Sequence, residues 1–279
     1  MLSYRHAFHA GNFADVLKHA VLANVLDYMT RKEKGFSYVD THSGAGMYSL
    51  YDEKAEKTGE YKDGIGKLYQ ANDLPELLED YVSLIKRFNN GDKLSIYPGS
   101  PSVAHSFFRR QDNCQLFELH STDHQLLSEH TERWRKCQVH QTDGYKGLLK
   151  LLPPVTRRGV VLIDPPYEIK DDYTKAVKTV IDAYRKFATG TFMIWYPVVK
   201  RESVDQMISE FQSSDVRNLL QIEFCTRADT DEYGMTGTGL FVVNPPWTLN
   251  KEMEEVLPFL SEKLGFKDSF YTLKQLINE

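Results

Sequence analysis

Cysteine is scarce in this chain of 279 residues: Cys114, Cys137 and Cys225 are the only three. Their number is odd and no pair has C-x-x-C spacing, so the sequence offers neither a disulfide framework nor a zinc ribbon. All three lie in apolar runs that are typical of strands. We therefore expect buried, reduced thiols, and this excludes the class of small secreted domains that depend on disulfides.

Long apolar runs are missing as well. The most hydrophobic early stretch, residues 20–29, is too short to span a bilayer, contains Asp27 and has no signal-peptide cleavage pattern. No tandem repeat of solenoid length is present. These absences predict a cytoplasmic protein that has no membrane partner.

The sequence also lacks an excess of positive charge. The chain has 34 lysines and arginines against 39 aspartates and glutamates, which gives a formal net charge of -5. A negative balance argues against a protein that coats nucleic acid through a general basic field, but it leaves room for a local basic patch. The candidate pairs Arg109–Arg110 and Arg157–Arg158 are also typical of solvated surface charge.

No group of histidines has metal-ligand spacing. His6 and His9 have no third and fourth ligand nearby, and His120 and His124 do not follow the H-E-x-x-H order of zinc peptidases. We expect no metal site.

Alternation of strand-like and helical stretches is the main feature that the sequence does have. Apolar runs recur, and most are separated by enough residues for a helix, which is typical of a parallel sheet covered on both faces. The runs are residues 36–41, 114–119, 137–142, 159–163, 191–196, 219–225 and 240–243. The last two are close enough to pair antiparallel. The expected fold class is α/β, with a mostly parallel seven-stranded sheet.

A helix is expected before the first strand. Asn12 is a suitable N-cap with Asp15 at position N3, and apolar residues follow at helical spacing. The pattern predicts an amphipathic helix over residues 12–32. Its more polar side has Asp15, Lys18 and His19, each one turn or less from the next.

The interval between the first two strands is about twice the length that a βα unit needs. Residues 74–90 look helical, so we expect a helical insertion over residues 51–96 within a single domain that spans residues 1–279. After the insertion, Ser100 at the N-cap and Pro101 at N1 predict the start of another helix.

The first strand ends in "VDTHSGAG", residues 39–46, an acid followed by a loop with two glycines. Ligands bind beyond the C-terminal ends of strands in open α/β sheets, and glycine lets a backbone approach a nucleotide closely. The stretch lacks the full G-x-G-x-x-G fingerprint and the Walker lysine. It resembles the first motif of S-adenosylmethionine-dependent methyltransferases, with His42 in the first glycine position, where its side chain can contact the cofactor.

Two further acids follow strand runs in the order that such an enzyme needs. Glu118 ends the second run, where a carboxylate can accept hydrogen bonds from both ribose hydroxyls. Asp143, followed by Gly144, ends the third run, where an acid can accept from the cofactor's adenine amino group. Each is a common strand-end acid when it is taken alone, but together with the glycine loop they indicate a nucleotide cofactor.

The stretch "VLIDPPY", residues 161–167, predicts the catalytic chemistry. Methylation of an exocyclic amine requires two acceptors for the amine protons, and Asp164 with the Pro165 carbonyl provides them at a spacing that the prolines stiffen. Tyr167 offers a stacking face for a base that has left its helix. None of the cysteines follows a proline, so no covalent nucleophile is expected.

A second stretch, "FVVNPPW" at residues 241–247, has the same chemical parts. Asn244 ends the run that we expect to be antiparallel, and the end of that run falls away from the cofactor loop. We interpret this stretch as a strand terminator rather than a second site.

The N-terminal arm completes the set of candidates. Tyr4, Arg5 and His6 can stack on bases or meet phosphate, and Lys18 and His19 follow on the first helix.

Six stretches of the sequence together resemble the bacterial 23S ribosomal RNA (adenine-N6)-methyltransferase J family. They are "YRHxFHAGNxADVLKH", "DTHxGAG", "YPGSP", "IDPPYE", "WYPV" and "NPPW", and the resemblance runs from Met1 to about Trp247. It implies a Rossmann-like class I methyltransferase fold that modifies adenine 2030 of 23S ribosomal RNA and works as a monomer.

The resemblance also implies roles for individual residues. Asp164 would be the catalytic acceptor and Tyr4 the aromatic that contacts the substrate, together with His6 and Lys18. The residues implied for S-adenosylmethionine are His19, His42, Ser100, Glu118, Asp143, Gly144 and Asp164. Two alternatives stay open: a guanine-N2 RNA methyltransferase, and a non-catalytic RNA-binding protein on the same fold.

Overall fold

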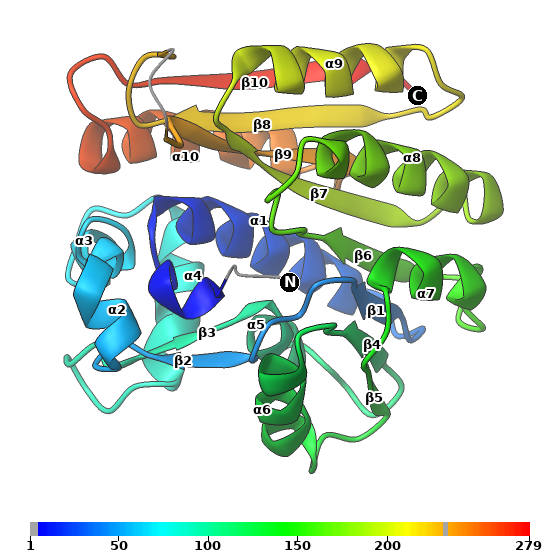
Figure 1. The fold of residues 1–279 in the computed structure, drawn as a ribbon, viewed down its shortest axis with the longest axis horizontal. Helices are drawn as coiled ribbons and strands as arrows, with labels where there is room; N and C mark the ends of the chain where they lie inside the picture. The colour runs from blue at the N-terminus through cyan, green and yellow to red at the C-terminus, as the bar shows by residue number, and fades with distance from the viewer. Residues whose placement is uncertain (1–4, 231–233) are drawn as a thin grey trace.

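A central mixed sheet with helices on both faces forms the body of the molecule, as the computed structural model shows (Figure 1). The structure describes residues 5–230 and 234–279. The eight strands of the sheet lie in the order β10-β8-β9-β7-β6-β1-β4-β5. They are β1 Ser37–Asp40, β4 Asn113–Phe117, β5 Cys137–His140, β6 Gly159–Ile163, β7 Thr191–Val198, β8 Leu219–Cys225, β9 Gly237–Val243 and β10 Phe270–Ile277.

Five neighbouring strands of the sheet are parallel to one another: β5, β4, β1, β6 and β7. Strand β9 runs antiparallel to both β7 and β8, which confirms the expected antiparallel C-terminal pair. The expected Rossmann-like α/β class is therefore confirmed. The expected number of seven strands is wrong by one, because β10 adds antiparallel to the outer edge of β8. Its side chains are at most half-buried, so the strand lacks the apolar run that marks the others.

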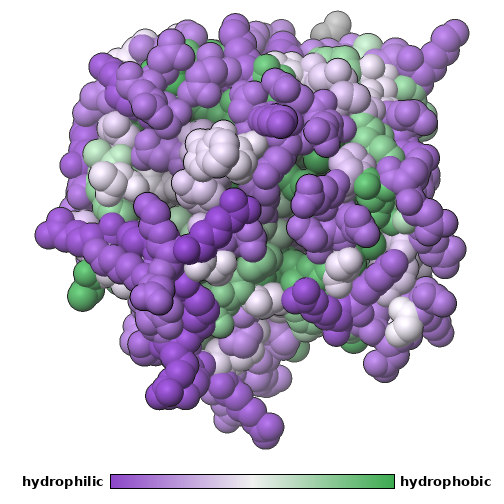
Figure 2. All heavy atoms as spheres, turned by 180° about the vertical axis from the view of Figure 1, so that it is seen from behind, coloured by the Kyte–Doolittle hydropathy of each residue, from purple (hydrophilic) through white to green (hydrophobic). Residues whose placement is uncertain are grey.

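Two apolar cores lie on opposite faces of the sheet, because the inner strands are buried on both sides. All residues of β6, β8 and β9 are buried. The helices over one face include α1 Phe13–Thr30, α4 Glu76–Arg87, α5 Ser100–His105, α6 Ser121–Thr131 and α10 Leu249–Leu264. The helices over the other face are α7 Gly144–Leu151, α8 Asp171–Lys186 and α9 Arg201–Gln212. On the face seen in Figure 2 hydrophilic residues dominate, and hydrophobic residues show mainly in a recess between them.

Helix α1 begins as the sequence predicts. The Asn12 side chain accepts hydrogen bonds from the backbone N–H groups of Ala14 and Asp15. The expectation of an amphipathic helix is wrong, however, because the polar side is also buried: Asp15, Lys18 and His19 are 1%, 3% and 1% exposed. These polar groups face the interior because they form part of the site described below.

Residues 51–96 include the helices α2 Glu53–Thr58, α3 Ile65–Tyr69 and α4, and the short 3-10 helix η2 Glu60–Lys62. A two-stranded antiparallel sheet of β2 Met47–Ser49 and β3 Ile96–Pro98 closes the segment at its base. Buried hydroxyls connect it to α1: Tyr81 of α4 bonds Tyr97 of β3 at 2.8 Å, and Tyr97 bonds the His19 ring at 2.8 Å. The segment is therefore tied to α1 by hydrogen bonds as well as by apolar packing.

Within the described residues, no helix has the length and apolarity that crossing a membrane requires.

A buried ion pair holds the C-terminal ends of β7 and β8 together. Glu223 is fully buried and accepts from the Arg201 guanidinium at 2.8 Å and from the Tyr196 hydroxyl at 3.0 Å. Arg201→Ala should lower the free energy of unfolding by about 3–5 kcal/mol, because it leaves the carboxylate buried without its cation. Urea denaturation measures the change. Glu223→Gln added to this variant should restore part of the loss; no recovery would contradict the charge argument.

Candidate active site

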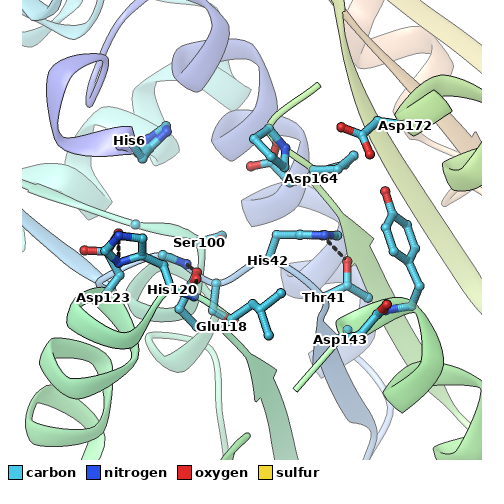
Figure 3. A pocket seen from close by; sticks show the side chains of 18 of the residues that line it. His6, Thr41, His42, Ser100, Glu118, His120, Asp123, Asp143, Asp164 and Asp172 are labelled. Atoms are coloured by element: carbon cyan, nitrogen blue, oxygen red, sulfur yellow. Dashed lines mark hydrogen bonds and ion pairs between the residues drawn. The ribbon is translucent and has the colours of Figure 1, made fainter. Parts of the chain in front are cut away.

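A cavity of about 300 Å³ opens at the C-terminal ends of the parallel strands, beside the second turn of α1 and the first turns of α5 and α7. Ligand sites of open α/β sheets lie at this edge. All described site residues that the sequence predicts line the cavity except Tyr167: His6, Lys18, His19, His42, Ser100, Glu118, Asp143, Gly144, Asp164 and Pro165. Figure 3 shows Asp164 and His6 on one side, with Glu118 and Asp143 across from them.

The glycine loop after β1 forms part of the cavity wall. Gly44 has a φ of +60°, a backbone conformation that favours glycine, and its N–H donates to Glu118 at 2.8 Å. The second Glu118 oxygen accepts from the His120 backbone N–H at 2.7 Å. Burial raises the pKa of the Glu118 carboxyl. Glu118 thus fixes the loop while it lines the cavity, and each carboxylate oxygen has capacity for a second hydrogen bond.

His42 stands in this loop and lines the cavity, as Asp164 does (Figure 3). Its ring nitrogen Nδ1 lies 2.8 Å from the Thr41 hydroxyl, and the ring meets the Tyr145 ring edge-on at 4.9 Å. Burial lowers the pKa of His42 to about 3, so the imidazole is neutral at neutral pH. A neutral ring can contact a positively charged sulfonium group without electrostatic repulsion.

Asp143 and Gly144 place helix α7 against the loop of β1. One Asp143 oxygen accepts from the backbone N–H groups of Tyr145 and Lys146 and caps the helix. A Cβ at Gly144 would lie 2.0 Å from the Thr41 carbonyl oxygen, so only glycine permits this approach.

A buried carboxyl that sequence reasoning did not assign lies under the cavity. Asp40, the last residue of β1, accepts from the Ser100 hydroxyl at 2.7 Å and from the Tyr38 hydroxyl at 2.9 Å. Burial raises the pKa of Asp40 to about 6. The expectation that Ser100 is an N-cap is wrong: Gly99 takes that position, and the Ser100 hydroxyl binds Asp40 instead.

Asp164 is joined to α1 by a lysine. The Lys18 ammonium lies 2.7 Å from Asp164 and 2.9 Å from Asp15, and its side chain is 4% exposed. Burial alone lowers the pKa of Lys18, but the charges of Asp15 and Asp164 outweigh it and raise the pKa. Asp15 in turn bonds the His6 ring at 2.9 Å. Burial acts to raise the pKa of Asp15, but the charges of His6 and Lys18 hold it well below its usual range.

His19, the other polar residue of α1 in the site, is held by the Tyr97 hydroxyl and stacks on that ring. Burial lowers the pKa of His19 to about 3, so its ring is neutral at neutral pH.

Tyr167 does not line the cavity. Its hydroxyl donates to the Trp195 carbonyl at 2.5 Å, and its ring packs on Tyr173 and Trp195. Its expected role as a stacking wall stays a prediction. Tyr4, the other expected aromatic, lies outside the described residues.

The second proline motif lies at the opposite edge of the sheet. The Asn244 side-chain amide donates to the backbone carbonyls of Ala188 and Gly190. The backbone carbonyl of Asn244 accepts from the Thr191 hydroxyl at the start of β7. The start of β7 is the edge away from Asp164, so the position of Asn244 agrees with its interpretation as a strand terminator.

Several lining residues escaped the sequence analysis. The most informative are Asp123, which pairs with Arg5 at 3.0 Å, and Tyr145 and Lys175 at the end near Asp143. Only Tyr145 had a local signal, because it follows the Asp143–Gly144 pair directly. Among the described residues, no group of His, Cys, Asp and Glu could hold a metal ion.

The residues of the cavity fit S-adenosylmethionine. The glycine loop, Glu118 and Asp164 all line the cavity; a carboxylate such as Glu118 would accept hydrogen bonds from ribose hydroxyls, and Asp164 would offer negative charge to a sulfonium. A glycine loop, strand-end acids and a D-P-P-Y segment at this edge define the chain as a class I methyltransferase.

The family can now be stated. The model of the family described as ribosomal RNA large subunit methyltransferase D, RlmJ, matches residues 33–276, and the chain belongs to this family. The protein is accordingly a methyltransferase, and S-adenosylmethionine supplies the methyl group when it is bound.

Similar proteins agree with this assignment. Ribosomal RNA large subunit methyltransferase J of Escherichia coli is 48% identical over 95% of this chain and 94% of its own length. The protein of the same name from Haemophilus influenzae is 49% identical with the same coverage. A crystal structure of a Legionella pneumophila protein is 39% identical, has a TM-score of 0.89, and covers 96% of this chain and 98% of its own.

Asp40 makes stability depend on pH. Its pKa in the folded protein is about 6, above the ordinary value, so the folded state retains a proton that the unfolded chain releases. Stability is therefore lost as the pH rises from about 4 to about 6 and stays reduced above that range. Relative to wild type, Asp40→Asn should gain up to about 3 kcal/mol between pH 4 and pH 7. Denaturant titrations at several pH values measure this; a constant difference would contradict the pKa argument.

Gly144→Ala should distort the site, since the added methyl group has no room beside Thr41. We expect a loss of about 1–3 kcal/mol in stability and weaker binding of S-adenosylhomocysteine. Calorimetric titration measures the affinity. Lys146→Ala, on the exposed side of the same helix, is the matched control and should change neither quantity.

Proposed function

We propose that the protein transfers a methyl group from S-adenosylmethionine to the N6 amine of an adenine in 23S ribosomal RNA, with adenine 2030 as the expected position. The observation that supports this most directly is the position of Asp164 and Pro165 in the cavity, next to the glycine loop. Two curated relatives, each about half identical to this chain, carry the name ribosomal RNA large subunit methyltransferase J.

Asp164 is suited to accept one amine proton in a hydrogen bond, and the Pro165 carbonyl is suited to accept the other. Loss of the amine's planarity exposes its lone pair for attack on the methyl group. The Lys18 ammonium lies on one Asp164 oxygen at 2.7 Å, and this leaves the other oxygen for the amine. Lys18 therefore positions the acceptor, in addition to the contact with the base that is assigned to it below.

The cofactor's parts correspond to the two sides of the cavity. We assign the ribose hydroxyls to Glu118 and the adenine amine to Asp143, with Gly144 beside it. We assign the methionine part of the cofactor to the remaining residues, which are His19, His42, Ser100 and Asp164. The imidazole rings of His19 and His42 are neutral at neutral pH, because burial lowers the pKa of each to about 3.

The RNA is assigned to the N-terminal side. His6 lines the cavity, and Arg5 next to it is paired with Asp123 across the opening. We assign His6, Lys18 and Tyr4 to contacts with the flipped base, and Tyr167 to stacking. We also propose a cytoplasmic monomer, formed by one domain in which residues 51–96 are a helical subdomain.

Guanine-N2 transfer is the competing reaction, because the same acceptor pair serves any amine bound to an aromatic ring. A non-catalytic RNA-binding role is disfavoured by the presence of both the acceptor and the open glycine loop.

Asp164→Ala should fold and bind RNA but transfer methyl groups at less than about a thousandth of the wild-type rate, because one amine acceptor is lost. Transfer of labelled methyl to 23S ribosomal RNA measures the rate. Asp171→Asn is the matched control, since this exposed aspartate begins α8 outside the cavity. Wild-type activity in the Asp164 variant would refute the mechanism.

The identity of the methylated base in 23S ribosomal RNA can be tested in cells. Mass spectrometry of 23S ribosomal RNA from cells without the gene should show one N6-methyladenosine fewer, and the wild-type gene should restore it. N2-methylguanosine in its place would refute the adenine assignment.

A further inference from the structure

Tyr145 has a buried polar atom that its surroundings leave unused. The residue is 5% exposed and lines the cavity from the start of α7. Its hydroxyl is buried and has no hydrogen-bond partner among the residues that the structure describes. Buried polar groups in native proteins nearly always have a partner, so an unpaired hydroxyl on a ligand cavity indicates a partner that arrives with the ligand.

Packing fixes the direction of this hydroxyl. The His42 ring meets the tyrosine ring edge-on at 4.9 Å, and the Lys175 ammonium lies 4.3 Å from the ring centre. These two contacts restrict rotation of the ring and so limit the directions that its hydroxyl can take.

The surrounding charge keeps the hydroxyl protonated. Burial raises the pKa of Tyr145, and the negative charges of Asp172, Asp143 and Asp164 raise it further. Asp143 and Asp172 lie on the same side of the cavity (Figure 3). The group is therefore a hydrogen-bond donor in a part of the site that otherwise has mainly acceptors.

Adenine needs such a donor. Its N6 amine donates, while the ring nitrogens N1 and N7 on either side of the amine accept. Asp143 can serve only the amine, since a carboxylate has no proton to give. A donor next to Asp143 completes the recognition of an adenine ring.

We infer that the Tyr145 hydroxyl donates a hydrogen bond to a ring nitrogen, N1 or N7, of the cofactor's adenine and so helps to select an adenosine cofactor. This inference rests on the proposed assignment of the adenine amine to Asp143. It adds a binding residue that the glycine loop and the strand-end acids do not identify.

Binding of S-adenosylhomocysteine by calorimetry tests the inference without RNA. Tyr145→Phe should bind the ligand about tenfold more weakly, as loss of one hydrogen bond predicts. The ligand-free variant should melt at the same temperature as wild type or higher, because it loses an unpaired buried hydroxyl. Tyr173→Phe is the matched control: its hydroxyl donates to the Pro197 carbonyl at 3.2 Å, so it should lose stability and keep its affinity.

The 1-deaza and 7-deaza analogues of S-adenosylhomocysteine identify the acceptor. Wild type should bind one of them about tenfold more weakly than the parent, whereas Tyr145→Phe should bind that analogue and the parent equally. Unchanged affinity in Tyr145→Phe would overturn the inference. Equal weakening of the parent and both analogues by the substitution would also overturn it.

Asp143→Asn separates this result from the proposed assignment of the adenine. Undiminished affinity in that variant would refute the role of Asp143, whereas the analogue comparison would still decide the role of Tyr145. Failure to methylate 23S ribosomal RNA would leave both binding results unchanged.

Discussion

A lysine ammonium enclosed between two carboxylates is the interaction on which the active site depends. Lys18 is buried between Asp15 of its own helix and Asp164 at the end of β6. Removing water from one ion is costly, and only the opposite charges around it make the arrangement stable. The ion pairs therefore fix the distance between α1 and the D-P-P-Y segment. They also connect the N-terminal arm to the acceptor, because Asp15 holds His6.

A second set of carboxyls organises the cofactor side. Glu118 holds the glycine loop through backbone N–H groups, and Asp40 gathers the Ser100 and Tyr38 hydroxyls beneath it. Both carboxyls have raised pKa values because they are buried. The site thus uses acids in two ways: some remain open to the ligand, and Asp40 keeps the wall of the cavity rigid.

Much of this arrangement could be predicted from the sequence. The apolar runs located seven strands, and the strand-end motifs located the glycine loop, Glu118, Asp143 and Asp164 at one edge of the sheet. Parallel strands bring their C-terminal ends together, so motifs far apart in the chain must meet there. The C-terminal strand β10 gave only a weak strand signal and was not counted in the sheet, because a half-buried edge strand lacks an apolar run. The hydroxyl of Ser100 was misjudged because the same residue type caps helices and binds carboxyls.

The sequence by itself determined the order of the polar motifs along the strands: the glycine loop comes first, then Glu118, then Asp143, and last the D-P-P-Y segment. Local patterns suffice for this because each motif follows its own strand. Only the tertiary structure decided that the polar side of α1 is buried and that Lys18 pairs with Asp164 far along the chain. It also decided that the Tyr145 hydroxyl, on the cavity, has no hydrogen-bond partner in the part of the chain that the structure describes. Burial and charge pairing depend on neighbours that are distant in sequence, and no local pattern records them.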